Sequence, residues 1–316
     1  MSNSNDAPID VEFEQDDSPI EIEVEQEFEV DFDDAPIELE AEQDEAATSE
    51  LEVEQKFAIY PGIENRLESL GFVRKSSKTP SLQFTDIYYD LPAPNWSLST
   101  QDIWLRYRGR KMNDTNRWKG NWQLKIGRRQ KAAQDDNEAN VDSESKSNSV
   151  TVYEEVQGEP ALTMAVYLSG DDESIQSLVE PTSASSGSTT DRPPEAPGNL
   201  TPFAEFETTR ASWTLSQEAE DRFPKFMGLS VDIDTTDFGY GVGEVEAILD
   251  ARDRDDAQAL SETKKCIGLL LSQLSEQQGD NEAPSLGKLE TFLKERQPDH
   301  FDALVETGIF RHLSQK

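Results

Sequence analysis

One short segment near residue 50 alternates ionisable and apolar side chains in a pattern that suits chemistry. It reads Leu-Glu-Val-Glu-Gln-Lys-Phe over residues 51–57. Because side chains of a β-strand alternate between its two faces, Glu52, Glu54 and Lys56 share one face. Two carboxylates and an ammonium group on one face suit a bound metal ion and a phosphate. A single such strand is also typical of a solvated edge strand, so the interpretation depends on whether other strands repeat the pattern.

The same alternation recurs along the chain. The pairs that share a strand face are Arg106 with Arg108, Gln123 with Lys125, Tyr153 with Glu155, Asp232 with Asp234, and Glu244 with Glu246, and Arg210 lies in a further segment of this kind. If the apolar faces pack outward, these charged faces line an enclosed interior. Burying so many ions costs several kcal/mol each unless they are paired or bind a charged ligand. Arg and Lys that grip a polyanion, with carboxylates that hold a divalent metal ion, fit such an interior. A sheet wetted by solvent on one face is the alternative.

Eight segments have the alternation of strands, and they determine the predicted fold class. They are residues 51–58, 84–89, 103–110, 121–127, 151–157, 204–215, 229–234 and 242–249. Helical spacing of apolar residues is rarer, and it occurs at 63–70, 256–276, 286–296 and 299–307. Eight strands with one charged face predict an α+β, mainly β protein: a closed eight-stranded antiparallel barrel with flanking helices.

The composition separates an acidic N-terminal segment from a foldable remainder. The 316 residues have a formal net charge of −36, and the first 50 contain 20 Asp or Glu and no Lys or Arg. We expect residues 1–49 to be a disordered acidic tail and residues 50–316 to be one domain, with flexible inserts at about 128–149 and 180–202. So acidic a chain is a poor candidate for binding nucleic acid or an anionic membrane.

Cysteine and histidine usage adds two expectations. Cys266 is the only cysteine, so no intrachain disulfide forms and a reducing compartment fits. No apolar run approaches the length of a transmembrane helix, and the acidic N-terminus is unlike a secretory or mitochondrial signal. We therefore expect a soluble, cytoplasmic, monomeric protein. His300 and His312 lie in the C-terminal helical region without a partner of metal-ligand type, and we expect them at the surface.

Together these residues resemble the CYTH group of triphosphate tunnel metalloenzymes. The mark of that group is a Glu-x-Glu-x-Lys strand, present here as Glu52, Glu54 and Lys56. The resemblance extends to the thiamine triphosphatase branch through DIYYD at 86–90, WLRYR at 104–108, WQLK at 122–125, RASW at 210–213, VDIDTTDFGYGVGEVEAIL at 231–249 and GKL around Lys288. It covers residues 51–316 outside the two inserts, and the long segment at 231–249 is far more specific than the five-residue motif.

The resemblance implies a tunnel that holds a small-molecule triphosphate, with Mg²⁺ as cofactor. The implied phosphate ligands are Lys56, Arg106, Arg108, Lys125, Arg210 and Lys288. The implied metal-side residues are Glu52, Glu54, Asp232, Glu244 and Glu246, with Glu155 as a further member. The resemblance also implies a catalytic pair of Lys56 and Tyr88, and a thiamine-binding role for Trp104, whose indole face attracts a cationic thiazolium ring.

The expected reaction is Mg²⁺-dependent hydrolysis of thiamine triphosphate to thiamine diphosphate and phosphate. Basic side chains would neutralise the phosphates and keep the terminal phosphorus in line for attack. Lys56, helped by Tyr88, would accept a proton if neighbouring cations lower its pKa. The alternatives are an inorganic tripolyphosphatase or nucleoside triphosphatase of the same fold, and a non-catalytic module that binds polyphosphate or nucleotides.

Overall fold

The computed structural model describes eight stretches of the chain, which lie in one compact unit, Glu45–Lys316. They are residues 49–75, 81–112, 117–128, 150–179, 193–250, 253, 255–275 and 286–310. The predicted acidic tail and the first predicted insert lie outside the described residues, apart from residues 49 and 128. The second predicted insert extends too far, because Leu200 is buried and a strand begins at Thr201.

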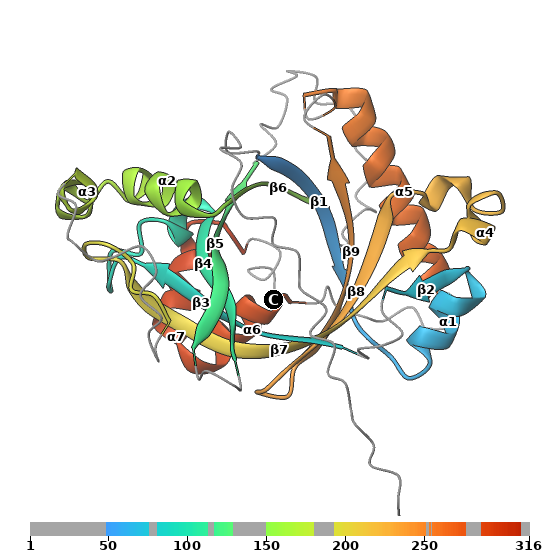
Figure 1. Cartoon of the computed structure of the whole chain (residues 1–316), viewed down its shortest axis with the longest axis horizontal. Helices are drawn as coiled ribbons and strands as arrows, with labels where there is room; N and C mark the ends of the chain where they lie inside the picture. The colour runs from blue at the N-terminus through green and yellow to red at the C-terminus, as the bar shows by residue number, and fades with distance from the viewer. Residues whose placement is uncertain are drawn as a thin grey trace, which may run out of the picture. The chain divides into compact units, whose positions relative to one another are not determined.

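A closed ring of eight antiparallel strands forms the centre of this unit (Figure 1). The strands are β1 (Glu50–Phe57), β3 (Leu82–Asp90), β4 (Ile103–Lys111), β5 (Trp118–Gly127), β6 (Thr151–Gln157), β7 (Thr201–Leu215), β8 (Leu229–Thr236) and β9 (Gly241–Leu249). Their order is β7-β3-β4-β5-β6-β1-β9-β8, and the pairing of β8 with β7 closes the ring. Each matches one of the eight predicted strands, so the predicted fold class is confirmed.

The long strand β7 makes the closure possible. Its first part pairs with β3 and its later part with β8. A ninth strand, β2 (Phe72–Arg74), pairs with the end of β7. Its three residues are too few to show alternation, which explains why it was not predicted.

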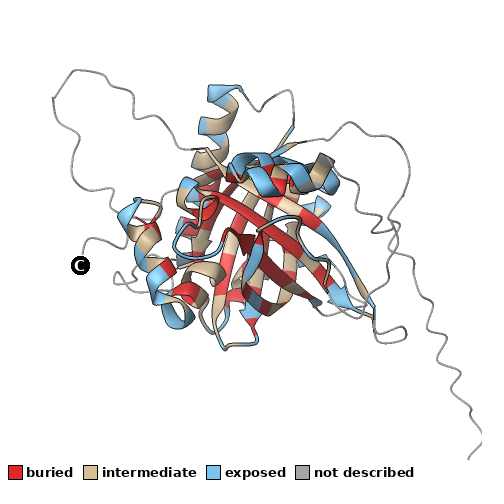
Figure 2. Ribbon diagram, turned by 90° about the vertical axis from the view of Figure 1, so that its left-hand side faces the viewer, coloured by how far each residue is buried: buried red, intermediate tan, exposed pale blue. Residues whose placement is uncertain are grey.

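Seven helices in the described part of the chain pack against the strands. They are α1 (Ile63–Ser69), α2 (Glu159–Ser169), α3 (Asp172–Val179), α4 (Gln217–Glu220), α5 (Ala257–Ser275), α6 (Lys288–Arg296) and α7 (Pro298–Glu306). The first, fifth, sixth and seventh match the four predicted helices, whereas α2, α3 and α4 were not predicted. In Figure 2, buried residues concentrate on the strands, and much of the helix surface is exposed. No helix in the described part of the chain is both long and apolar enough to cross a membrane.

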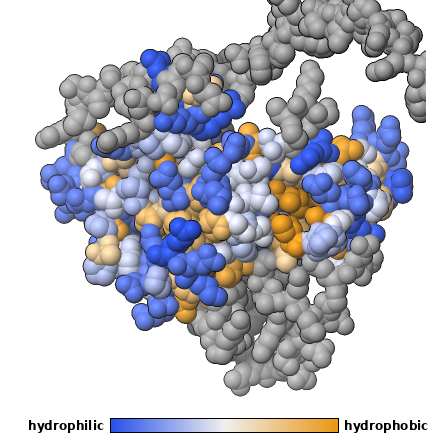
Figure 3. Space-filling model, turned by 90° about the horizontal axis from the view of Figure 1, so that it is seen from below, coloured by the Kyte–Doolittle hydropathy of each residue, from blue (hydrophilic) through white to orange (hydrophobic). Residues whose placement is uncertain are grey.

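The outer face of the ring is apolar, as the alternation predicted. One cluster joins Val53 and Val245 to Ile267 of α5. A second joins Leu124 to Ala165 of α2. On the outside of the molecule, seen from below, apolar side chains form patches between polar ones (Figure 3). Covering the apolar strand faces with helices leaves the charged faces turned into the ring.

A third apolar cluster lies on the inner side of the ring. It joins Trp104 and Phe206 of the strands to Leu293 of α6 and Leu304 of α7. The two C-terminal helices therefore pack against the inner faces of β3, β4 and β7, and the N-terminus of α6 reaches the interior. The inner face is consequently divided into a charged part and an apolar part.

His300 of α7 is buried, contrary to the expectation that it lies at the surface. Its Nε2 atom lies 2.8 Å from Oγ of Ser99, in the turn Ser99–Gln101 that precedes β4, and the two atoms share a hydrogen bond. The imidazole also stacks on Trp96, with ring centroids 4.5 Å apart. Burial lowers the pKa of His300 to about 4, so the ring is neutral at neutral pH. His312 lies outside the described residues.

Candidate active site

A cavity of about 400 Å³ lies within the ring, and the predicted ionisable residues line it. The predicted phosphate ligands Lys56, Arg106, Arg108, Lys125, Arg210 and Lys288 all line its wall. They come from β1, β4, β5, β7 and the N-terminus of α6. Of the predicted acidic residues, Glu52, Glu54, Glu155, Glu244 and Glu246 line the wall, and Asp232 is buried behind it next to Arg210.

Strand register brings these side chains together. On β1, Glu54 lies opposite Glu246 of β9, and Lys56 lies opposite Glu244. Residues that lie directly opposite each other share a face of the sheet and are close enough to interact. The five-residue pattern on β1 therefore continues across the neighbouring strand as further carboxylates.

Lys125 lies among three carboxylates. Its ammonium group forms an ion pair with Glu52 and lies 3.2 Å from Glu54 and 3.8 Å from Glu155. Burial alone would disfavour the charge, but these carboxylates raise the pKa of Lys125 above its ordinary value. Lys125 is therefore a permanent cation in the cavity wall.

Lys56 is also held as a cation. It forms an ion pair with Glu54 and lies 3.4 Å from Glu244. Burial opposes its charge, yet these two carboxylates and further acidic neighbours raise the pKa of Lys56 well above its ordinary value. The condition under which Lys56 would accept a proton, a pKa lowered by neighbouring cations, is therefore not met in the ligand-free protein.

Tyr88 does not pair with Lys56 as the resemblance implied. The Tyr88 side chain is hydrogen-bonded to Arg106, and its ring stacks on Phe206 with centroids 5.9 Å apart. Two other phenols, those of Tyr153 in β6 and of Tyr240, interact electrostatically with Lys56. The structure places both predicted catalytic residues in the cavity wall without bringing them together, so their catalytic roles stay predictions.

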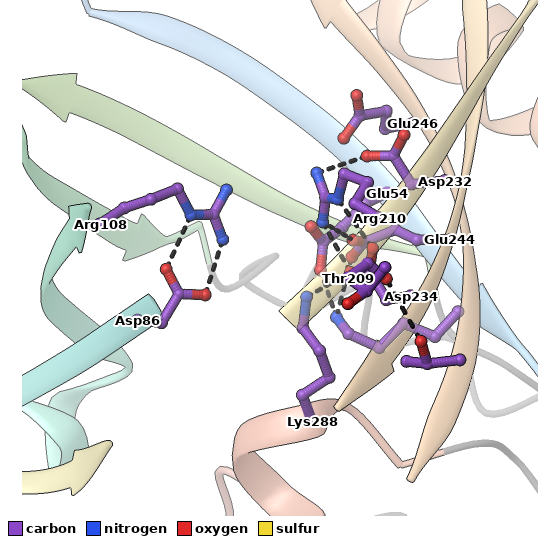
Figure 4. A network of polar contacts seen from close by, with 12 residues as sticks. Glu54, Asp86, Arg108, Thr209, Arg210, Asp232, Asp234, Glu244, Glu246 and Lys288 are labelled. Atoms are coloured by element: carbon purple, nitrogen blue, oxygen red, sulfur yellow. Dashed lines mark hydrogen bonds and ion pairs between the residues drawn. The ribbon is translucent and has the colours of Figure 1, made fainter. Parts of the chain in front are cut away.

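Two arginines are held rigidly by buried carboxylates, as Figure 4 shows. Arg108 donates two hydrogen bonds to Asp86, at 2.7 and 2.8 Å. Arg210 donates two to Asp234, at 2.8 and 2.7 Å, and also pairs with Asp232. Although burial opposes ionisation, the arginines hold the pKa of both Asp86 and Asp234 below its usual range. Such bidentate contacts fix the plane of the guanidinium group and orient its remaining hydrogen-bond donors.

Lys288 brings the N-terminus of α6 into the same network. Its ammonium group pairs with Asp234, which it shares with Arg210 (Figure 4). Burial and repulsion by Arg210 lower the pKa of Lys288 to about 8, despite the attraction of Asp234. Lys288 therefore changes its charge close to neutral pH, unlike Lys56 and Lys125.

The comparisons with known proteins identify the family of this chain. The family model for the CYTH domain matches residues 50–274. This chain belongs to the CYTH domain family. It is 29% identical to human thiamine-triphosphatase over 269 residues, which cover 84% of this chain and 94% of the human protein. Thiamine-triphosphatase of Macaca fascicularis is also 29% identical, over 263 residues that cover 82% of this chain and 90% of the relative. The solved PH1819 protein of Pyrococcus horikoshii matches with a TM-score of 0.39 and 17% identity, over 78% of this chain and 99% of that one.

Several residues of the CYTH site were not assigned a role from the sequence. Asp86 lies two residues before Tyr88 on β3, so alternation places it on the same face. Asp234 follows Asp232 by the same rule. Glu290 and Asp102 line the cavity from outside the strands, and no alternation could have indicated them.

The carboxylates of this CYTH cavity fit Mg²⁺ in their chemistry. In the part of the chain that the structure describes, no three or more His, Cys, Asp or Glu side chains are arranged as a ready metal site. Basic side chains engage the carboxylates instead. Carboxylate oxygen atoms are the ligands that Mg²⁺ prefers. Burial next to Asp232 and Glu244 raises the pKa of Glu246 to about 8. A bound divalent cation would offset the mutual repulsion of such crowded carboxylates.

Proposed function

We propose that this CYTH domain hydrolyses thiamine triphosphate to thiamine diphosphate and phosphate, with Mg²⁺ as cofactor. The observation that carries the proposal is the convergence of six basic side chains, from four strands and one helix, on one cavity lined by carboxylates. The two relatives named thiamine-triphosphatase support the choice of substrate.

The basic residues form two groups that bind phosphate in different ways. Lys56 and Lys125 are permanent cations that exchange their carboxylate partners for phosphate oxygens when the substrate enters. Arg108 and Arg210 are already oriented by Asp86 and Asp234, so little side-chain freedom is lost when they bind phosphate. Together they would keep the terminal phosphorus in line for attack by water, while the bond to the leaving diphosphate breaks.

The acidic excess of the wall explains why a divalent cation belongs in the proposal. Eight carboxylates and six basic side chains line the cavity, and a triphosphate adds further negative charge. When bound, Mg²⁺ would neutralise phosphate oxygens and activate water, and Glu52, Glu244 and Glu246, with Asp232 behind them, would hold it. The protein's own cations would then be free to bind the phosphates.

A phosphate-release panel tests the proposal. Thiamine triphosphate, inorganic tripolyphosphate and ATP are each supplied with Mg²⁺, Mn²⁺ or Ca²⁺, and kcat/KM is compared. We expect thiamine triphosphate with Mg²⁺ to give the highest value. Lys125→Met should lower it by about 100-fold or more, the effect of about 2.7 kcal/mol of lost electrostatic stabilisation. Lys119→Met, at an exposed position of the same strand, is the matched control and should stay close to the wild type.

The panel also separates the alternatives. A higher value for tripolyphosphate or ATP would replace the proposed substrate within the same chemistry. Binding of all three compounds without phosphate release would indicate a non-catalytic module. Trp104→Ala adds a second criterion, because its loss should impair turnover of thiamine triphosphate far more than turnover of tripolyphosphate.

A further inference from the structure

Asp102 is held in an unusual conformation at the wall of the cavity. It immediately precedes β4 and has a φ of 65°, in the left-handed region that few residues other than glycine adopt. Its carboxylate accepts a hydrogen bond of 2.9 Å from Nε1 of Trp104. The carboxylate is therefore fixed at the edge of the indole ring.

The end of β5 keeps Asp102 in this place. The backbone N–H of Gly127 donates a hydrogen bond of 2.8 Å to the carbonyl oxygen of Asp102. A Cβ atom on Gly127 would lie 1.9 Å from Oδ2 of Asp102, so a larger residue there would displace the carboxylate. Strained backbone that its surroundings hold in place is typical of functional sites.

Aromatic and apolar side chains line the cavity together with this carboxylate. Trp104 and Phe310 both line the cavity, with their ring planes within 8° of parallel and their centroids 6.4 Å apart. Leu289 and Ile309 line the cavity as well. An aromatic face next to a carboxylate attracts an organic cation, because the ring quadrupole and the negative charge act in the same direction.

This apolar compartment adjoins the basic side chains. Trp104 lies directly opposite Lys125 on the neighbouring strand. Tyr153 is close to both parts, since it interacts electrostatically with Lys56 and with Asp102. A ligand whose phosphates lie at Lys125 and Lys56 can therefore place its other end at Trp104 and Asp102, which line the same cavity.

We infer that Asp102 is a specificity-determining residue that selects substrates with a positively charged organic group next to the phosphate chain. The inference rests on the proposed triphosphatase function and adds the basis of selectivity for the organic part. Tripolyphosphate has no such group, and the bases of the common nucleotides are neutral, so neither gains from the carboxylate. The thiazolium ring of thiamine is a permanent cation, so the Asp102 carboxylate attracts it.

The test is Asp102→Asn. Asparagine tolerates the left-handed conformation and keeps an oxygen that accepts the Trp104 hydrogen bond, whereas the negative charge is lost. We expect KM for thiamine triphosphate to rise roughly tenfold, the equivalent of about 1.4 kcal/mol, while KM for tripolyphosphate stays unchanged or falls. Asp172→Asn removes a charge from an exposed position of α3 and is the matched control.

Equilibrium binding separates this inference from the proposed function. The dissociation constants of thiamine diphosphate and pyrophosphate are measured by calorimetry for the wild type and Asp102→Asn, after thermal unfolding shows that both are folded. A selective loss of thiamine diphosphate affinity supports the inference even if the wild type releases no phosphate from any triphosphate. Equal losses for both ligands, or no loss for thiamine diphosphate, would overturn it.

Discussion

At the scale of single residues, the cavity tolerates its cations because buried carboxylates accompany each of them. Asp86 and Asp234 are almost fully buried, and each holds one arginine through two hydrogen bonds. Such pairs offset the desolvation of both groups only when the geometry is good. The same contacts orient the guanidinium groups before a substrate arrives, which lowers the entropy lost on binding.

Removing the charge of Asp86 should therefore destabilise the protein. Asp86→Asn leaves Arg108 without its ionic partner, and because Arg108 keeps 21% of its side-chain exposure, we expect a loss of about 1–3 kcal/mol in the free energy of unfolding. Urea unfolding at neutral pH measures it. The double variant Asp86→Asn/Arg108→Gln should lose less than the sum of the two single variants, and strict additivity would contradict the pairing.

Lys288 should give the reaction an alkaline limit. Its pKa of about 8 means that it is charged below and neutral above this pH, so its attraction for phosphate falls as the pH rises through 8. We expect kcat/KM to fall on that side, because kcat/KM reports groups of the free enzyme. Arg stays protonated, so Lys288→Arg should move the limit to higher pH. Lys264→Arg, in α5 away from the cavity wall, is the control. If the alkaline limit of kcat/KM stays at the same pH in Lys288→Arg, the limit belongs to another group.

Alternation predicted which strand side chains enter the ring, because the period of two is set by backbone geometry alone. It could not predict which of them meet on neighbouring strands. The pairing of Lys56 with Tyr153, and of Tyr88 with Arg106, depends on strand order and side-chain direction. The charge state of Lys56 depends on the carboxylates of Glu54 and Glu244 beside it, so whether its pKa is lowered could not be judged from the sequence.

At the scale of elements, the strands were predictable and several helices were not. The buried face of α2 consists largely of small residues such as Ala161 and Ala165, which give only a weak helical pattern of hydrophobicity. The short helices α6 and α7 were predicted, but not that they pack inside the ring. Lys288 and Leu293 of α6 thus contribute to the charged and apolar parts of the interior respectively.

The contact between α7 and the turn before β4 should make stability depend on pH. His300 has a pKa of about 4 in the folded protein and 6.5 as its ordinary value, so the unfolded chain binds the proton first as the pH falls. The contribution of His300 to stability is present above pH 6.5 and is lost between 6.5 and 4. Urea unfolding of the wild type and His300→Gln at pH 7, 6, 5 and 4.5 measures this. We expect the stability difference between them to shrink as the pH falls, and a constant difference would contradict the burial of a neutral imidazole.

At the scale of the whole molecule, net charge opposes the proposed substrate. The chain carries −36, the cavity wall has more carboxylates than basic side chains, and the substrate is a polyanion. Long-range electrostatics therefore slow the approach of a triphosphate, and affinity has to come from contacts inside the ring and from divalent cations. The first 50 residues hold 20 of the acidic groups, so they contribute much of this long-range repulsion.

Deleting residues 1–48 should consequently raise kcat/KM for any triphosphate at low salt, with kcat nearly unchanged. Screening predicts that the gain disappears with added salt, because the Debye length falls from about 30 Å at 0.01 M to about 8 Å at 0.15 M. Initial rates across this range of salt concentrations measure it. A full-length variant with the acidic residues of 1–48 replaced by Asn and Gln separates charge from chain length, and it should behave like the deletion. Equal KM values for all three proteins at low salt would show that the acidic segment does not influence substrate approach.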